Sequence, residues 1–241
     1  TMFDYCLAMA LLYFKEQKCD VVILETGLGG TYDSTNACGV PDVTVIAKIG
    51  FDHMAILGDT LAKIAAEKAG IIKHGTALVL ESQEKEAMDV LNKAAECADI
   101  KTTKVVNLDE IRILPQKDGK QCFSYAGYDA VTMKMLGVHQ YENAVAAMLA
   151  AELFFEKYFA GKKNVPERKA LQHAIREGID RTQWMGRMEL VSNDPFFLMD
   201  GAHNSNGVEA LKKSLETMYP DEKFHFIMGV MADKDYGEMI R

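Results

Sequence analysis

An apolar run that ends on a carboxylate and a glycine-rich loop is the feature that most constrains the fold. Residues 20–25 predict a strand, because four consecutive apolar side chains stop at Glu25. An unbroken apolar run is typical of a strand buried on both faces of a parallel sheet. Residues 26–42 then show no clear helix or strand pattern. Because open α/β sheets bind ligands beyond the carboxyl ends of their strands, we expect Glu25 and this loop to border a ligand site.

Strand-like and helix-like segments alternate through the first hundred residues. The expected elements are helix 2–17, strand 20–25, strand 43–47, helix 60–70, strand 76–80 and helix 84–97. This alternation predicts an α/β fold with a largely parallel sheet that helices cover on both faces.

The pattern changes at about residue 103. Short strands with turns at Asp118-Gly119 and Ala126-Gly127 predict an antiparallel meander over residues 103–135. The segments expected to follow are helices 140–160 and 167–179, a junction at 182–187, strand 196–200, helix 205–219, strand 223–229 and a final helix. We place a domain boundary between residues 1–184 and 185–241. We expect truncation at both ends, because the first domain begins on a helix and the second has too few elements.

The composition excludes several classes of partner. The chain has 241 residues, of which 49% are hydrophobic, and a formal net charge of -8. This acidic balance argues against a nucleic-acid or anionic-membrane surface, so an anionic substrate needs a local cationic pocket. Five scattered cysteines without metal-site spacing indicate reduced thiols in a cytoplasmic protein. The apolar run at residues 6–14 is too short to predict a membrane span.

Two side chains at predicted strand ends suggest a metal and phosphate site. The carboxylate of Glu25 is a hard oxygen ligand that suits Mg²⁺, and an exposed glutamate is the alternative. His53 follows the next strand and the turn at residues 50–52, which predicts the same sheet edge if the strands are parallel. Its other interpretations are a structural histidine, a phosphate-positioning group or a ligand of Mn²⁺.

A lysine lies on the inward face of the predicted helix 60–70. Lys68 shares one helical stripe with Ile64, Ala65 and Ile72. Because burying an unpaired ammonium is costly, it must pair with an acid, lose its proton or be covalently modified. A deprotonated lysine can take up carbon dioxide as a carbamate, which is an anionic metal ligand. The alternative is an ammonium that reaches water at the helix end.

Small and polar residues in the loop at residues 26–42 favour ligand binding. Gly27, Gly29 and Gly30 permit close backbone approach and orient free amides toward anions, although a plain tight turn also explains them. The short polar side chains from Asp33 to Asn36 either bind substrate or cap the loop.

A second edge between a strand and a helix occurs near residue 200. Strand 196–200 ends at Asp200, and His203 lies in the connection to helix 205–219. Both are placed to contact a nucleotide ribose or phosphate, whereas Asn204 or Ser205 is explained as a helix N-cap.

Six motifs, taken in order, resemble the folylpolyglutamate synthase and dihydrofolate synthase family within the Mur ligase superfamily. They are ETGLGGTYDSTN, PDVTVIAKIGFDHMAILGDTLAKIAAEKAGIIK, HQYENA, GRMELV, DGAHNSNGVEAL and MGVMADKDY. The resemblance implies the mostly parallel sheet of a phosphate-loop-type ATPase domain whose N-terminal part is missing. An incomplete Rossmann-like α/β C-terminal domain, the glutamate-ligase domain of the family, is implied to follow.

The resemblance also implies roles for individual residues. It makes Glu25, His53 and Lys68 metal ligands, with Lys68 carbamylated and both Lys68 and His53 catalytic. The positions implied to contact ATP are Asn143, Arg187, Asp200 and His203, and those implied to bind substrate are Gly29, Gly30, Asp33 and Asn36. From the residues alone, Asn143 and Arg187 would be surface polar groups.

The chain departs from the family pattern at two kinds of position. Thr31 stands where bacterial members often carry Arg, and Met185 where Pro is common, which leaves the preferred folate form open. No G-x-x-x-x-G-K-[ST] phosphate loop occurs in the sequence. We therefore expect this chain to be nearly inactive alone.

The implied reaction is ATP-dependent formation of an amide between L-glutamate and folate or dihydropteroate, through an acyl phosphate. Mg²⁺ is the implied cofactor, with a monovalent cation as a further candidate, and the protein is expected to be a cytoplasmic monomer. Two rivals stay open. One is a peptidoglycan Mur ligase, and the other is a non-catalytic remnant that binds nucleotide or folate.

Overall fold

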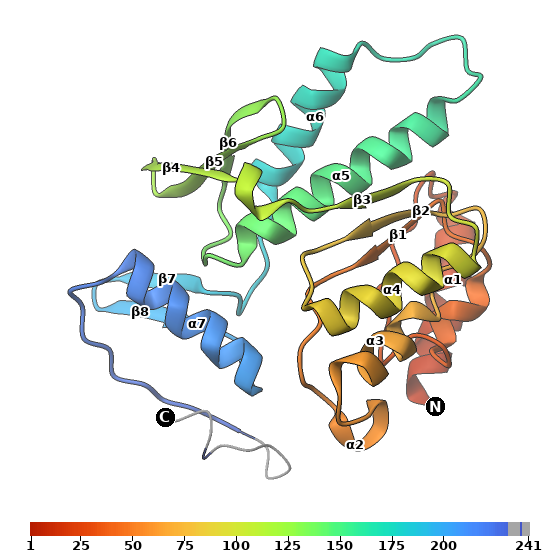
Figure 1. Ribbon diagram of the computed structural model, residues 1–241. Coiled ribbons are helices and arrows are strands. Elements are labelled where there is room, and N and C mark those ends of the chain that lie inside the picture. Colours follow the sequence, from red (N-terminus) through yellow and green to blue (C-terminus); the bar gives the residue numbers. More distant parts are fainter. Residues whose placement is uncertain (231–236, 238–241) are drawn as a thin grey trace. The chain divides into compact units, whose positions relative to one another are not determined.

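The computed structural model of the chain describes residues 1–230 and residue 237. It forms two compact units, Thr1–Lys104 and Val105–Arg241 (Figure 1). The boundary expected between residues 184 and 185 remains a prediction about domains. The final helix expected after residue 229 lies outside the described residues. In the part of the chain that the structure describes, no helix is both long and apolar enough to cross a membrane.

The first unit is an α/β arrangement around a three-stranded sheet. Its elements are α1 (Met2–Gln17), η1 (Ser34–Cys38), β1 (Val43–Ile46), α2 (Met54–Leu57), α3 (Leu61–Ala69), β2 (Ala77–Leu80), α4 (Lys85–Cys97) and β3 (Thr103–Val105). The strands lie in the order β1-β2-β3, and β1 pairs with β2 in parallel from Val43 opposite Ala77 to Ile46 opposite Leu80. The predicted parallel pairing of these two strands is confirmed.

The core of the first unit forms where α3 and α4 bury their apolar stripes against the sheet. The side chains of Leu78, Leu80 and Leu91 are fully buried, and Ile64 of α3 is 1% exposed. Burying a leucine of this kind stabilises the fold by roughly 1.5–3 kcal/mol. Thr60 caps α3 by accepting a hydrogen bond from the Lys63 amide at 3.2 Å, which fixes where the helix begins.

The strand expected at residues 20–25 is wrong for this structure. These residues form no strand ladder, and their apolar side chains are exposed, with Ile23 at 91%. A strand exists only where a neighbour accepts its N–H groups and donates to its C=O groups. The helix before it, α1, has the expected bounds, but none of its residues is buried. Residues 2–17 and 20–25 thus have the apolar side chains of a protein interior, but no other described helix or strand buries them.

The second unit begins with an antiparallel sheet and two helices. After η2 (Leu108–Glu110), the strands β4 (Arg112–Lys117), β5 (Lys120–Tyr125) and β6 (Tyr128–Met133) pair in that order, followed by α5 (Gln140–Phe159) and α6 (Arg168–Arg181). Asp118 and Gly119 both have positive φ, at 53° and 73°, as a tight hairpin turn requires. The predicted meander and its two turns are confirmed over residues 112–133, whereas residues 103–105, where we expected it to begin, form β3 of the first sheet.

The last elements of the second unit are a strand pair and a helix. They are β7 (Glu189–Asn193), β8 (Phe196–Met199), which are antiparallel, and α7 (Ser205–Met218). Our sequence interpretation missed β7. A small core of Leu136, Met188 and Leu215 joins α7 to the segment after β6, and the Ser214 hydroxyl accepts a hydrogen bond from the Val138 amide at 3.0 Å.

The strand expected at residues 223–229 is also wrong for this structure. The segment has no strand assignment, and Ile227 is 99% exposed. Phe224 nevertheless packs against the small core, beside the ring of Tyr219. An apolar strand pattern without a ladder partner gives an extended segment at most, for the same reason as at residues 20–25.

The burial contrast within the first unit gives a stability test. We expect Leu91→Ala to reduce the free energy of unfolding by about 2–5 kcal/mol, because truncation leaves a cavity in a closed core. Leu12→Ala in α1 is the matched control, since Leu12 is 62% exposed, and its effect should stay within about 0.5 kcal/mol. Urea unfolding followed by circular dichroism measures both. Equal losses for the two variants would contradict this assignment of the core.

Candidate functional site

The glycine-rich loop of the first unit is fastened to the carboxyl end of α3. The Thr31 amide donates to the Glu67 carbonyl at 2.9 Å, and the Asn36 side chain donates to the Gly70 carbonyl at 3.0 Å. The ammonium of Lys73 donates to the Gly39 carbonyl at 2.7 Å. The last carbonyls of a helix have no partner within it, so the first two contacts engage acceptors at the end of α3, and the third ties the residues after the helix to the loop. Loop and helix end therefore form one structural part.

Two glycines make this close contact possible. A Cβ atom at Gly30 would lie 2.6 Å from the Glu67 carbonyl oxygen, and one at Gly70 would lie 2.4 Å from the Cα atom of Thr31. Both obstacles are backbone atoms, which cannot rotate away. Gly30 is also buried against Lys68, whose Cα would be 3.1 Å from the added atom. The structure therefore brings two predicted site residues, Gly30 and Lys68, into contact.

Asp33 holds the interior of the loop together. Its carboxylate accepts hydrogen bonds from the amides of Gly27, Leu28 and Thr35, at 3.0, 2.9 and 2.9 Å, and from the Thr35 hydroxyl at 2.5 Å. Partial burial raises the pKa of this carboxyl, but the hydrogen bonds from Thr35, Leu28 and Gly27 outweigh it and hold the pKa below the usual value of 3.8. The Gly27 amide, which the sequence pattern predicted to face an anionic ligand, thus donates to a carboxylate of the chain itself, and the Leu28 amide does the same.

The three predicted metal ligands have different surroundings. Lys68 is partly buried at the end of α3, whereas Glu25 and His53 are exposed. His53 has left-handed backbone geometry, with φ of 50°, and its imidazole Nε2 lies 3.9 Å from the Asp52 carboxylate. No group of three acidic, imidazole or thiol side chains in the described part of the chain is arranged to hold a metal. The assignment of Glu25, His53 and Lys68 to one metal site remains a prediction.

Two residues that we did not predict position the segment leading to His53. The buried carboxylate of Glu81, just after β2, accepts a hydrogen bond from the Lys48 amide at 2.6 Å. The Gln83 side chain accepts from the Ile49 amide at 2.8 Å and donates to the Ala47 carbonyl at 3.0 Å. The signal was present in the sequence, because Glu81 follows an apolar strand as Glu25 follows its apolar run.

In the second unit, Asp200 ties the end of β8 to the residues before β7. Its carboxylate accepts hydrogen bonds from the amides of Met188 and Ala202, at 2.7 and 2.8 Å. The Gly201 amide donates to the Gly186 carbonyl at 2.7 Å. Arg187 lies between these two contacts along the chain, and its guanidinium is 3.7 Å from the position of a Cβ built on Gly201. The geometry therefore places Arg187 beside Asp200 and Gly201.

Asn143 is linked to the same neighbourhood through two side chains at the start of α5. Its amide donates to Gln140 at 3.0 Å, and Gln140 contacts the His139 imidazole at 3.0 Å. Burial lowers the pKa of His139, the nearby Asp200 carboxylate raises it and the Arg187 guanidinium lowers it, with a net lowering. The buried Nδ1 of His139 has no hydrogen-bond partner among the described residues.

Three of the four predicted ATP positions thus meet around His139, and the fourth is close by along the chain. His203 is in hydrogen-bond contact with the Gly201 carbonyl at 2.8 Å through Nδ1. An exposed guanidinium, a neutral imidazole and amide groups supply donors suited to phosphate and ribose oxygens. We missed His139, although a histidine immediately before the predicted helix 140–160 was a visible signal.

The chain matches two protein families along its length. Residues 3–151 match the Mur ligase middle domain, and residues 186–241 match the Mur ligase glutamate ligase domain. A curated relative, the dihydrofolate synthase/folylpolyglutamate synthase of Bacillus subtilis (strain 168), is 38% identical over 100% of this chain and 55% of its own length.

Solved structures agree with these sequence matches. An FPGS-AMPPCP-folate complex has a TM-score of 0.88 and 28% identity, covering 100% of this chain and 57% of the other. The folylpolyglutamate synthase of Thermotoga maritima has a TM-score of 0.79 and 30% identity, covering 100% and 53%. The chain thus spans about half the length of the relatives it matches.

The contact between the loop and α3 predicts the effect of adding one methyl group. Gly30→Ala should reduce the free energy of unfolding by about 1–3 kcal/mol, because the new Cβ meets fixed backbone. It should also speed proteolytic cleavage within residues 26–42. Gly178→Ala in α6 is the control, since nothing lies within 4 Å of its Cβ and alanine favours the helix by up to about 1 kcal/mol. Unchanged cleavage in the Gly30 variant would argue against the close contact.

The lowered pKa of Asp33 predicts a pH-dependent loss of stability. A carboxyl whose pKa is lower in the folded state stabilises the fold above the pKa of the unfolded chain, and this contribution disappears as pH falls through the folded pKa. Asp33→Asn should therefore be less stable than the parent at pH 7, and the difference should shrink below about pH 4. Unfolding curves at several pH values measure this. Exposed Asp20→Asn is the control, and a difference independent of pH would oppose the assignment.

Proposed function

Because the chain belongs to the folylpolyglutamate synthase and dihydrofolate synthase family of Mur ligases, we propose that it serves as part of an ATP-dependent amide ligase. The reaction joins the amine of L-glutamate to a carboxyl group of folate or dihydropteroate. The observation that carries the proposal is the meeting of Asn143, Arg187 and Asp200 around His139, within a chain whose whole length matches such enzymes.

The proposed chemistry has two steps. A carboxylate oxygen of the pterin substrate attacks the γ-phosphorus of ATP, which forms an acyl phosphate and releases ADP. The glutamate amine then attacks the acyl carbon, the bond to phosphate breaks, and the amine loses a proton as the amide forms. Phosphoryl transfer depends mainly on positioning and on neutralising charge.

The residues near His139 are suited to the nucleotide. Arg187 carries a planar permanent cation that can bind phosphate through two parallel hydrogen bonds. Asp200 already accepts two backbone amides, so its proposed contribution is to hold the segment around Arg187 in position. Asn143 and His203 supply polar groups for the nucleotide, and the uncharged state of the buried His139 leaves the charge balance to Arg187 and Asp200.

In the first unit, the loop is proposed to bind the pterin substrate or its glutamyl end. Gly29 and Gly30 form its buried part, and Asp33 and Asn36 keep its shape through hydrogen bonds. These contacts support a positioning role for Asp33 and Asn36 in addition to the substrate contact that the family resemblance implies.

We propose that the complete enzyme requires a divalent metal ion. Glu25, His53 and a carbamylated Lys68 are the residues that we propose for it, with Mg²⁺ as the ion and a monovalent cation as a further candidate. A bound divalent ion would supply neutralising charge next to the phosphates. In the described residues no acid forms an ion pair with Lys68, which agrees with a lysine available for modification. We further propose a cytoplasmic monomer.

A ligation assay tests the proposal. The chain, and a longer protein that contains it together with a phosphate loop, are incubated with MgATP, L-glutamate and either folate or dihydropteroate, and ADP and the amide product are measured. We expect turnover by the longer protein and almost none by the chain alone. Preference for a UDP-muramyl acceptor would instead support a peptidoglycan Mur ligase. Nucleotide binding without turnover by the longer protein would support a non-catalytic remnant.

One substitution addresses the nucleotide assignment directly. In the longer protein, Arg187→Gln should lower kcat/KM by roughly 10- to 100-fold, since a charge-assisted hydrogen bond contributes about 1.5–3 kcal/mol. Arg112→Gln, at an exposed position of β4, is the control with the same change of charge. Equal activity of the two variants would remove Arg187 from the proposed site.

A further inference from the structure

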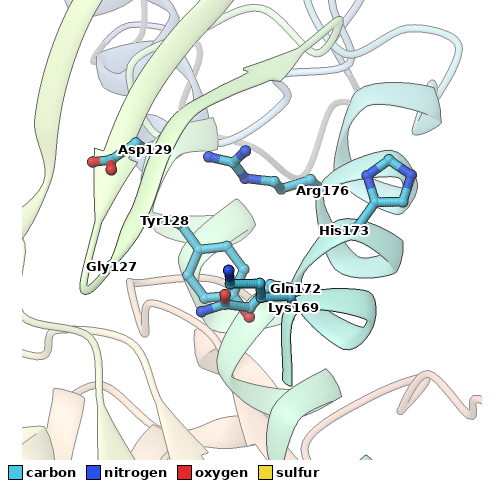
Figure 2. Close-up of a pocket in the computed structure, with 7 residues that line it drawn as sticks. All are labelled: Gly127, Tyr128, Asp129, Lys169, Gln172, His173 and Arg176. Carbon is cyan, nitrogen blue, oxygen red and sulfur yellow. The ribbon is translucent and has the colours of Figure 1, made fainter. Parts of the chain in front are cut away.

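A pocket in the second unit lies outside the residues discussed so far. It is formed by one face of α6, by Gly127 in the turn between β5 and β6, and by the first residues of β6, with a volume of about 240 Å³ (Figure 2). The side chains used here are Tyr128, Asp129, Lys169, Gln172, His173 and Arg176. Drug-sized ligands occupy pockets of roughly 300–1,000 Å³, so this space suits a smaller molecule.

The polar face of α6 follows from residue spacing. Lys169, His173 and Arg176 are separated by four and three positions, which places them on one side of a helix. Figure 2 shows Arg176 reaching from α6 toward the start of β6, which carries Asp129. The pocket therefore presents two cations from the helix and one carboxylate from the start of β6.

The acidic residues of α6 pair with groups other than Lys169 and Arg176. Glu177 pairs with Arg181, and Asp180 accepts hydrogen bonds from Lys120 at 2.7 Å and from Thr132 at 2.6 Å. Among the described residues, no ion pair or hydrogen bond engages Lys169 or Arg176. In a chain with a net charge of -8, this local excess of positive charge is a specific feature.

Tyr128 lines one side of the pocket, and its hydroxyl already has a hydrogen-bond partner within the protein. Its hydroxyl donates to the Glu152 carboxylate at 2.7 Å. Burial and this bond raise the pKa of Tyr128, while Arg168 and Arg176 lower it, and the net shift is upward. The hydroxyl thus stays protonated and occupied, so recognition of a ligand falls to Lys169, Arg176, Asp129 and the Gln172 amide.

We propose that this pocket binds a small amino dicarboxylate, with free L-glutamate as the ligand, at a site separate from the proposed nucleotide residues. Two carboxylates match Arg176 and Lys169, and an ammonium matches Asp129. The choice of glutamate rests on the proposed function, in which glutamate is a substrate. The charge pattern stands without it and predicts that a dicarboxylate with an amine binds more tightly than one without.

Titrations of the 241-residue chain followed by amide NMR test the proposal, without nucleotide. L-Glutamate should cause saturable shifts of the Gly127 and Tyr128 amides, and glutarate and inorganic phosphate should bind at least about tenfold more weakly. Arg176→Gln, and Lys169→Gln at a more exposed position, should each weaken the binding of L-glutamate about tenfold or more. Arg181→Gln, on the same helix but outside the pocket, should bind as the parent does. Thermal unfolding identifies any variant that has lost its fold.

Asp129→Asn gives the sharpest outcome, because it should abolish the preference for L-glutamate over glutarate. The proposal is overturned by the absence of saturable shifts, by phosphate binding as tightly as L-glutamate, or by equal weakening in the Arg181 and Arg176 variants. Because no ATP is present, failure of the ligation assay with intact glutamate binding would remove only the proposed function.

Discussion

The backbone contact between the glycine-rich loop and the end of α3 is the interaction on which the first unit's candidate site depends. Thr31 donates to Glu67, and Gly30 and Gly70 provide the space for that approach. The contact fixes the position of a long loop, which contains the helical turn η1, next to Lys68. A methyl group added at Gly30 would collide with the backbone of α3. The loop can therefore lie this close to the helix only because Gly30 has no side chain.

In the second unit, the carboxylate of Asp200 holds the backbone of the candidate site in place. Asp200 accepts amides from Met188 and Ala202, so the residues on either side of the β7–β8 pair are held together. Arg187 and His139 then face a common neighbourhood, and the buried imidazole is kept uncharged. In both units, residues that the family resemblance assigns to ligands also hold the backbone that presents them. Asp33 and Asp200 are the clearest cases, because each carboxylate accepts hydrogen bonds from backbone amides of the segment that it holds.

Sequence patterning located most elements but failed where an element needs a partner. The helices at residues 2–17 and 205–219 and the β1–β2 pairing agree with the prediction, since helix hydrogen bonds are local and an N-cap was visible for the second helix. Residues 20–25 and 223–229 carry an apolar strand pattern, yet neither forms a ladder in the structure. Strand β7 was missed because its pattern is short, although its partner β8 was predicted as strand 196–200.

The sequence by itself determined the α/β alternation, the meander with its two glycine turns, the ordered motifs of the Mur ligase family and the identity of the candidate residues. Only the tertiary structure decided that Gly30 contacts the end of α3, that Glu81 and His139 belong beside the predicted residues, and that α6 and the start of β6 line a charged pocket. The physical reason is distance along the chain. Periodicity and caps are local properties, whereas each of these contacts joins segments tens of residues apart, whose meeting depends on how the helices and strands pack.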